Sequence, residues 1–288
     1  MKKAYLPAIT SLRAVAAYMV YIVHTDPFSV EKFGQGVFDF FDEFHVGVTI
    51  FFVLSGFLIT YNYYDEEKLN FKEYFVNRFA RIYPMYFFFF FATFLFFNLS
   101  NINFPFSNFN IYIANLTFLR GFSDTYKHTG LGQGWTLTVE EMFYFMAPLV
   151  FVLIKKSKLY LYFLPILLLL IGFFLVFIFK NVDFLGFMKN YQFMLELTFF
   201  GRCFEFFIGI GLALLIRHKK LSFKYFTYFG IAGMFLSSYL ISTLKGNTNS
   251  GMNTSLGLFI NTFVLPIIGI APLIYGLIFE KTPISLLF

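Results

Sequence analysis

The chain has 288 residues, of which 58% are hydrophobic and only 13% are charged, and its formal net charge is +6. One globular core cannot bury that many apolar side chains, whereas apolar runs of about 20 residues are typical of transmembrane helices. The composition therefore excludes an ordinary soluble protein, and the lack of short alternating segments argues against an outer-membrane barrel. The only cysteine, Cys203, excludes an intrachain disulfide and a cysteine-based metal or redox motif.

Eight apolar segments predict an all-α, polytopic bundle of transmembrane helices. The first span is expected to stay uncleaved, because no small-residue cleavage site follows it. The segment 109–119 is apolar but short, so it is expected to lie in the interface or re-enter the membrane. No internal repeat or soluble domain is apparent, and 1–288 is expected to form a single transmembrane domain. The expected spans are 7–26, 44–63, 82–98, 138–154, 159–179, 197–216, 225–243 and 256–279.

Basic residues predict the orientation, because cytoplasmic loops are enriched in Lys and Arg. If the N-terminus is cytoplasmic, most Lys and Arg residues outside the spans fall in segments on the inside, among them Lys2, Lys3, Lys68, Lys219 and Lys220. The sequence therefore predicts a cytoplasmic N-terminus. The net positive charge follows the loops, so it does not indicate a nucleic-acid partner.

Ionisable side chains within apolar spans cost about 2.5–3.5 kcal/mol each to insert and therefore suggest function. The first span carries Arg13 and His24, which are 11 residues apart. That spacing is close to three helical turns, so both lie on one face, about 16 Å apart along the axis. The predicted orientation places Arg13 toward the cytoplasm and His24 near the outer surface. The alternative is that the two residues only anchor the helix at the two interfaces.

Two arginines, Arg78 and Arg81, share one helical face at the expected inner mouth of the span 82–98, and Tyr83 follows them. Such a pair suits a phosphate group. The alternative is ordinary anchoring of the span by positive charges on the cytoplasmic side.

Two adjacent carboxylates begin the fourth expected span. Thr138 is expected to cap this helix with Glu141 at the capping-box position, which explains Glu141 but leaves Glu140 unexplained. Glu140 shares a face with Tyr144, four residues later. Trp135, the only tryptophan, stands just before and could be a simple interfacial anchor.

Two further groups lie in expected spans. Arg202 and Glu205 are three residues apart, so an intrahelical ion pair is expected, with either a structural or a functional role. Ser55 is not in a G-x-S-x-G turn, so Ser55 and Gly56 are expected to allow close helix packing rather than nucleophilic catalysis. The four histidines lack metal-ligand spacing on a helix, and no metal site is expected.

Five segments occur in a fixed order: LRAVAAYMVYIVH, GVTIFFVLSGFLIT, NRFARIYPMY, GWTLTVEEMFYF and GRCFEFFIGIGLA. In this order they resemble the acyltransferase-3 family of bacterial membrane O-acyltransferases over about residues 8–217. Thr136 stands where the family has serine. The family usually has ten spans, whereas this sequence reaches EKTPISLLF after the eighth. The C-terminal helices of the family pattern are therefore expected to be missing.

The resemblance implies transfer of an acyl group, commonly acetyl, from cytoplasmic acyl-CoA to a hydroxyl of an extracytoplasmic glycan. It also implies a multi-pass protein of the bacterial inner membrane with no permanently bound cofactor. Two classes remain as alternatives, a transporter of polysaccharide or linked lipid and an inactive truncated membrane subunit.

Roles follow for the residues that match the family motifs. His24 is expected to be the general base, since a neutral imidazole can take the proton of a hydroxyl. Arg13 would bind acyl-CoA or stabilise negative charge, and Glu140 would orient His24 or bind the acceptor. Acyl-CoA would be bound by Arg78, Arg81 and Tyr83. Support is expected from Trp135, Tyr144, Arg202, Glu205, Ser55 and Gly56.

Overall fold

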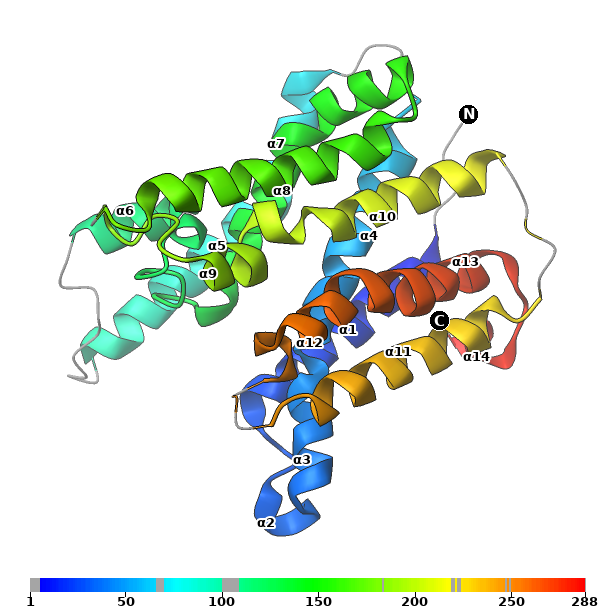
Figure 1. Cartoon of the computed structure of the whole chain (residues 1–288), viewed down its shortest axis with the longest axis horizontal. Helices are drawn as coiled ribbons and strands as arrows, with labels where there is room; N and C mark the ends of the chain where they lie inside the picture. The colour runs from blue at the N-terminus through cyan, green and yellow to red at the C-terminus, as the bar shows by residue number, and fades with distance from the viewer. Residues whose placement is uncertain are drawn as a thin grey trace. The chain divides into compact units, whose positions relative to one another are not determined.

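A computed structural model describes residues 6–65, 70–99, 109–182, 184–218, 221, 224–246, 248 and 250–287 (Figure 1). In these residues the regular elements are helices, apart from one isolated antiparallel bridge between Ser123 and Phe187. The predicted all-α class is therefore confirmed. Five basic residues used to predict the orientation lie outside the described residues, namely Lys2, Lys3, Lys68, Lys219 and Lys220.

Each expected span coincides with a helix or with a run of helices. The α-helices are α1 (Pro7–Thr25), α2 (Val30–Phe33), α3 (Gln35–Asp42), α4 (Gly47–Tyr63), α5 (Phe71–Leu99), α6 (Phe109–Leu116), α7 (Trp135–Lys156), α8 (Tyr160–Phe179), α9 (Tyr191–Leu197), α10 (Phe199–His218), α11 (Phe226–Thr243), α12 (Ser255–Phe259), α13 (Ala271–Phe279) and α14 (Pro283–Leu287). The 3-10 helices are η1 (Glu43–Val46), η2 (Leu119–Phe122), η3 (Gly132–Gly134) and η4 (Gly251–Asn253), and η5 (Ile260–Ile270) is a π-helix.

Seven helical segments of the described chain are long and apolar enough to cross a membrane. They correspond to the expected spans except 225–243. That stretch forms α11, as predicted, but the helix contains three serines, two threonines and two glycines. These residues lower its mean hydropathy, which explains why α11 is not among the seven.

The helix α5 starts well before the expected residue 82. It runs for 29 residues from Phe71 and includes both Arg78 and Arg81. The two arginines lower the hydropathy of the first turns without preventing a helix, because arginine has a high helix propensity. The helix therefore begins 11 residues before the expected span, and the position of the membrane boundary along it stays a prediction.

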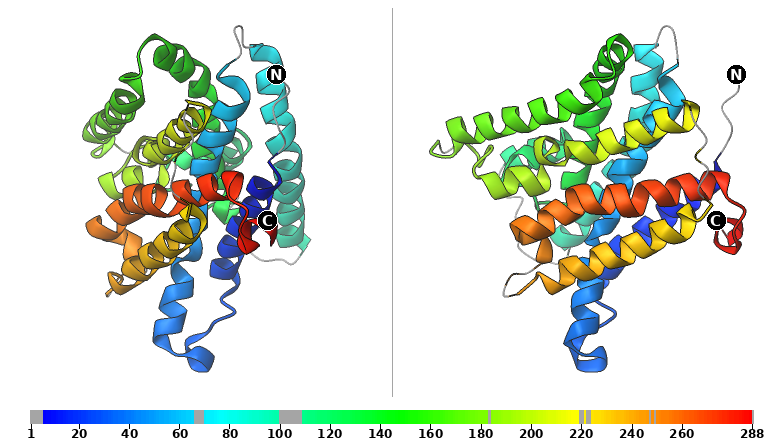
Figure 2. Two further views of the ribbon diagram at one scale, coloured as in Figure 1. Left: turned by 90° about the vertical axis from the view of Figure 1, so that its right-hand side faces the viewer. Right: turned by 45° about the vertical axis from the view of Figure 1, so that its right-hand side comes forward.

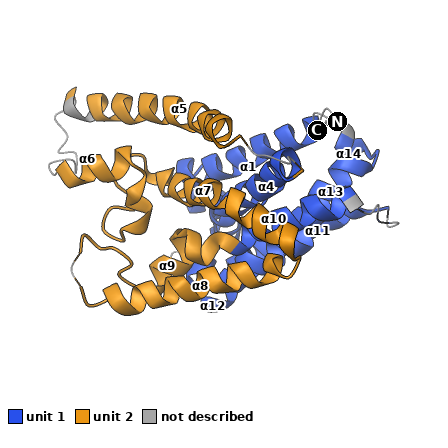
Figure 3. Ribbon diagram, turned by 90° about the horizontal axis from the view of Figure 1, so that it is seen from above, with its two compact units in different colours: residues 1–64, 204–288 blue, residues 65–203 orange. Residues whose placement is uncertain are grey.

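The described residues form two compact units (Figure 3). Unit 1 comprises residues 1–64 and 204–288, and unit 2 comprises residues 65–203. The boundary falls within α10, so one continuous helix contributes to both units. The expectation of a single domain over 1–288 stays a prediction.

Glycines set the close packing of α4 against α10 in unit 1. A Cβ on Gly56 would lie 2.1 Å from the carbonyl oxygen of Phe206, and a Cβ on Gly209 would lie 2.1 Å from the carbonyl oxygen of Val53. The two helices therefore meet backbone to backbone, which needs residues without a Cβ. This is the close packing predicted around Ser55, which is itself buried.

The helix α11 packs antiparallel against the run from η5 to α13, and the two lie side by side in Figures 1 and 2. A Cβ on Gly230 would lie 2.4 Å from the backbone nitrogen of Leu273, and one on Gly276 would lie 2.4 Å from that of Thr227. Glu280 caps the start of α11, because its carboxylate accepts the backbone N–H of Thr227 at 3.0 Å.

Arg217, on α10, caps the C-terminal end of α4 in the same unit. The Nη2 of Arg217 donates to the carbonyl oxygens of Thr60 at 2.9 Å and Tyr61 at 2.8 Å. Both carbonyls belong to the last helical turn, and that of Thr60 also accepts the backbone N–H of Tyr64 at 3.1 Å, so Arg217 adds a donor at the end of the helix. The cation also complements the negative end of the helix dipole.

Unit 2 contains α5 to α9 and the start of α10. The hydroxyl of Tyr74 on α5 donates to the backbone carbonyl oxygen of Tyr144 on α7 at 3.0 Å. The rings of Phe75 and Phe145 lie 5.2 Å apart beside this contact. Within the segment 109–119, α6 has eight residues and is too short to cross a bilayer, as predicted.

Candidate functional site

Arg13 and His24 lie on α1, in different surroundings. Arg13 is half-buried, and its Cζ lies 5.8 Å from the centroid of the Phe51 ring on α4. His24 is exposed in the last turn of α1. The cation–π contact holds Arg13 against α4, whereas the imidazole of His24 is accessible.

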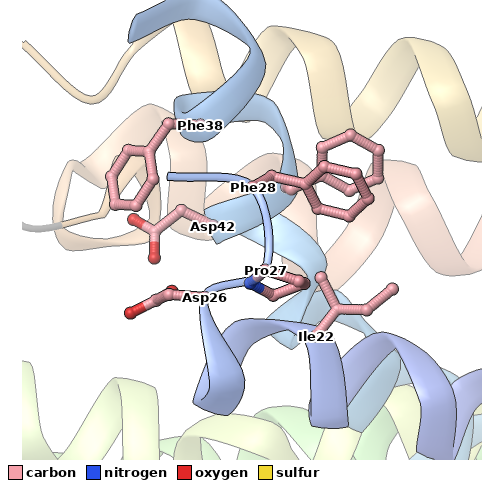
Figure 4. Close-up of a pocket in the computed structure, with 7 residues that line it drawn as sticks. Ile22, Asp26, Pro27, Phe28, Phe38 and Asp42 are labelled. Atoms are coloured by element: carbon pink, nitrogen blue, oxygen red, sulfur yellow. The ribbon is translucent and has the colours of Figure 1, made fainter. Parts of the chain in front are cut away.

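A shallow pocket lies at the C-terminal end of α1 (Figure 4). Figure 4 shows the carboxylates of Asp26 and Asp42 on one side of it and the ring of Phe28 on the other. His24 comes two residues after Ile22, about 200° around the helix axis, and so points away from the pocket. None of the predicted site residues lines it. The pocket has an empty volume of about 170 Å³ and is lined by Ile22, Asp26, Pro27, Phe28, Phe38, Phe41 and Asp42.

The acidic side of this pocket is partly neutralised by Lys245. Its Nζ lies 2.7 Å from Oδ2 of Asp42 and 3.0 Å from Oδ1 of Asp39. Burial disfavours the charged amine, but the hydrogen bonds and charges of the two aspartates outweigh that effect and raise the pKa of Lys245. These contacts tie α3 to the segment that follows α11.

A second set of predicted residues meets between α5 and α7 in unit 2. The hydroxyl of Tyr144 donates to Oε2 of Glu140 at 3.3 Å, which confirms that the two share a helical face. The guanidinium of Arg78 lies beside the same tyrosine, with its Cζ 5.8 Å from the ring centroid. Arg78, Tyr144 and Glu140 therefore form a continuous chain of contacts.

Glu141 belongs to this cluster as well. Its carboxylate lies within electrostatic range of Arg78 and Tyr83 on α5, and of Glu140 beside it. The Oε1 atom is buried and accepts no hydrogen bond from any part of the chain that the structure describes. Two carboxylates, an arginine and two tyrosines thus meet within two candidate spans.

The expected cap of α7 was wrong. The helix begins at Trp135, three residues before Thr138, and Gly134 at its N-cap has no side chain to offer. The hydroxyl of Thr138 instead donates to the backbone carbonyl oxygen of Phe118. The capping box that explained Glu141 is therefore absent, and this carboxylate needs another explanation.

The expected separation of Arg78 from the two carboxylates was also wrong. Seven residues of α5 precede Arg78, which is about 10 Å of helix. Arg78 lies within electrostatic range of Glu141 on α7, which was expected at the opposite side of the membrane, whereas the position of Arg78 at the mouth of the span stays a prediction. Arg81 is exposed, and Tyr83 stacks on Phe79 with ring centroids 4.1 Å apart.

The remaining predicted residues lie on α7 and α10. Trp135 is half-buried at the first position of α7. Arg202 and Glu205 are both buried on α10, and Nη1 of Arg202 donates to the carbonyl oxygen of Glu196 at 3.1 Å. The ion pair between Arg202 and Glu205 stays a prediction.

The three residues expected to be catalytic are divided between the units. Arg13 and His24 belong to unit 1, and Glu140 belongs to unit 2. The pairing of Glu140 with His24 therefore stays a prediction. No group of three His, Cys, Asp or Glu side chains that could hold a metal ion occurs among the described residues.

Arg120 was missed by the sequence reasoning, which counted it only as a loop charge. It lies in η2 and is completely buried. Burial lowers the pKa of its guanidinium, and the neighbouring Tyr86 acts in the opposite direction. His128, which follows η2, is exposed overall, but partial desolvation of its ring and then the charge of Lys127 lower its pKa. The available sign of a specific structure here was the repeated glycine in GLGQGW, residues 130–135.

The acyltransferase-3 family, described as an acyltransferase domain, matches residues 6–282. This match extends beyond residues 8–217, where the motifs placed the resemblance. No solved structure matches the chain.

Two curated proteins are similar to the chain over part of their length. The peptidoglycan O-acetyltransferase OatA of Listeria monocytogenes serovar 1/2a is 29% identical over 160 residues, which cover 51% of this chain and 24% of OatA. YrhL of Bacillus subtilis (strain 168), provisionally named as a peptidoglycan O-acetyltransferase, is 28% identical over 174 residues, 54% of this chain and 25% of YrhL. The matched region is about a quarter of each relative. Because the family match covers nearly all of this multi-pass helical chain, the chain belongs to the acyltransferase-3 family of membrane acyltransferases.

Proposed function

We propose that this chain transfers an acetyl group from acyl-CoA to a hydroxyl of a peptidoglycan-type glycan. The observation that carries the proposal is the cluster of Arg78, Glu140 and Glu141 within two apolar helices. Ionisable side chains are costly to insert into a membrane, so their presence in such helices indicates a functional site. The family supplies the acyl chemistry, and the names of the two relatives suggest the acetyl group and the acceptor. None of these matches supports the alternative of a transporter.

In the proposed reaction the acceptor oxygen attacks the thioester carbonyl carbon of the donor. A C–O bond forms, the C–S bond breaks, and CoA leaves as the thiol. His24 takes the proton of the hydroxyl as the attack proceeds and returns it to the leaving sulfur. Its exposed position at the end of α1 gives a glycan access to the imidazole.

The arginines serve the donor in this proposal. Arg78, with Tyr83 beside it, binds phosphate groups of CoA, since a guanidinium offers several donors in a fixed fork. Arg13 stabilises the negative charge that develops on the thioester oxygen. Glu140 orients the imidazole or binds the acceptor. The protein would work in the bacterial inner membrane, with its N-terminus and the donor on the cytoplasmic side.

The test uses purified protein in proteoliposomes with isotopically labelled acetyl-CoA and peptidoglycan fragments. We expect label in ester linkage to the glycan, and loss of that transfer in His24→Ala. Thr25→Ala is the matched control, because Thr25 is the next residue, is exposed and bonds only its own helix at Tyr21. Full transfer by His24→Ala would refute the role of His24. No transfer by well-folded wild-type protein would favour the alternative of a non-catalytic subunit.

A further inference from the structure

Arg120 is a buried cation whose two terminal nitrogens find acceptors without an acid, whereas its buried Nε has no hydrogen-bond partner among the described residues. Its guanidinium donates to Oδ1 of Asn115 at 2.7 Å, to the carbonyl oxygen of Leu131 at 2.6 Å and to that of Thr129. The ring of Tyr86 lies 5.9 Å from its Cζ. Among the described residues no carboxylate lies within ion-pair distance of it. A buried charge is costly unless hydrogen bonds compensate it, and here the bonds of both terminal nitrogens do so in a geometry that suits the planar guanidinium of arginine.

The surrounding backbone is shaped to the guanidinium. A Cβ on Gly134 would lie 1.4 Å from Nη2 of Arg120, so no other residue fits there without displacing the side chain. Gly130 has a φ of +67°, and its Cβ would lie 2.4 Å from the Asn115 oxygen that Arg120 binds. Both glycines belong to GLGQGW. We call residues 115–134, held in this way, the Arg120 bracket.

The bracket is fixed to the first turns of α7. Gly134 directly precedes Trp135, where α7 begins. The hydroxyl of Thr138 donates to the carbonyl oxygen of Phe118, and a Cβ on Gly121 would lie 2.5 Å from the Cβ of Thr138. Residues on both sides of Arg120 therefore hold the start of the helix that carries the two adjacent carboxylates.

We propose that Arg120 is a positioning residue, which fixes the start of α7 through the bracket and thereby places Glu140 and Glu141. The kinetic part of this inference rests on the proposed function, whereas the structural part does not. Lysine cannot replace Arg120, because a single ammonium group cannot reach three acceptors that are arranged around a planar fork.

The first test does not depend on measuring acetyl transfer. Trp135 is the only tryptophan and lies next to Gly134, so its fluorescence reports the bracket directly. In Arg120→Lys we expect an aqueous quencher to reach Trp135 about twofold more readily, because the segment opens locally. The control is Lys127→Gln, which removes a positive charge from the same segment but breaks a partly exposed pair with Asp124 and a cation–π contact with Phe193, neither of which holds Arg120. Equal quenching in wild type and Arg120→Lys would overturn the proposal.

The second test separates positioning from general destabilisation. In Arg120→Lys we expect kcat to fall about tenfold or more with the KM for acetyl-CoA unchanged, because misplacement of catalytic groups costs rate. The same change in a Glu140→Gln/Glu141→Gln background should cause little further loss, since it acts through these two carboxylates. A loss that multiplies fully in that background would overturn the proposal.

A milder variant decides the matter if Arg120→Lys does not fold. Thr138→Val keeps the shape of the side chain and removes only the bond to Phe118, and it should give the same quenching and kinetic changes to a smaller extent. Unchanged quenching and unchanged kcat in Thr138→Val would contradict the bracket. Absence of acetyl transfer by the wild type would refute the proposed function, while the quenching measurements would still decide the structural part.

Discussion

The contact between α4 and α10 allows one prediction to be worked out from the structure. In Gly56→Ala the new Cβ would lie 2.1 Å from the carbonyl oxygen of Phe206, and ordinary contact begins at 3.4 Å. The two helices would have to separate locally by about 1.3 Å, in a core packed as tightly as a crystal. Overpacking of this kind costs about 1–3 kcal/mol.

That cost should be visible as a fall in the unfolding temperature of the purified protein in detergent. A chain of this size loses about 2–4 °C per kcal/mol, so we expect a decrease of about 2–12 °C. The matched control is Gly36→Ala in α3, where a Cβ would meet nothing within 4 Å. Because alanine favours a helix by up to about 1 kcal/mol over glycine, the control should be equal or more stable than wild type.

The double variant Gly56→Ala/Gly209→Ala gives a further check. Both residues lie at the same contact, and a Cβ added to either would lie 2.1 Å from a backbone oxygen of the facing helix. Once the first substitution has separated the helices, the second should cost less than it does alone. If Gly56→Ala unfolded at the same temperature as Gly36→Ala, the backbone contact of α4 and α10 would be disproved.

Three further predictions concern charges. Glu141→Gln should lower acetyl transfer about tenfold or more, since its carboxylate faces Arg78 and has no capping role, and an unchanged rate would contradict its place in the site. Lys245→Met should lower the unfolding temperature, because it removes the ion pairs with Asp39 and Asp42. In the wild type the stabilisation by charged Lys245 is present below pH 10.5 and is lost as the pH rises through the raised pKa of Lys245, so the unfolding temperatures of the two proteins should converge in alkaline buffer. Because the pKa of His128 is lowered in the folded protein, the folded state favours the neutral imidazole, and stability falls as the pH drops below 6.5. The unfolding temperature of His128→Gln should therefore decrease less than that of the wild type as the pH is lowered, which thermal scans across that range would show.

Hydropathy was sufficient to predict most of the helices. The apolar runs are long, and a membrane leaves helices as one of few structures that satisfy the backbone. The boundaries failed where polar residues stand inside a helix. The low hydropathy of Arg78 and Arg81 led to a predicted start of α5 that is too late. Thr138 was predicted to be the N-cap of α7, although that helix begins at Trp135.

The candidate site was predicted in part. The spacing of Glu140 and Tyr144 indicated a contact that the structure confirms, because neighbours four apart on a helix must meet. The approach of Arg78 to the same tyrosine could not be predicted, since it depends on how far α5 extends alongside α7. Arg120 escaped notice because a lone arginine in a polar loop is interpreted as a topology signal. Its three acceptors lie 5, 9 and 11 residues away, and only the fold of this segment brings them around the guanidinium.

The pairing of α11 with the run from η5 to α13 has a consequence for biogenesis. The helix α11 falls outside the seven segments that hydropathy selects, whereas the segment Ser255–Phe279 is among them with a mean hydropathy of 2.2, so α11 is the less hydrophobic of the two. Ser237 and Ser238 of α11 are buried, so protein rather than lipid surrounds its polar side chains. Residues 226–279 should therefore leave the translocon as one helical hairpin, in which the more hydrophobic arm recruits the weaker one. Substitutions at Gly230 or Gly276 would then disturb the topology of the nascent chain before they affect the stability of the finished protein.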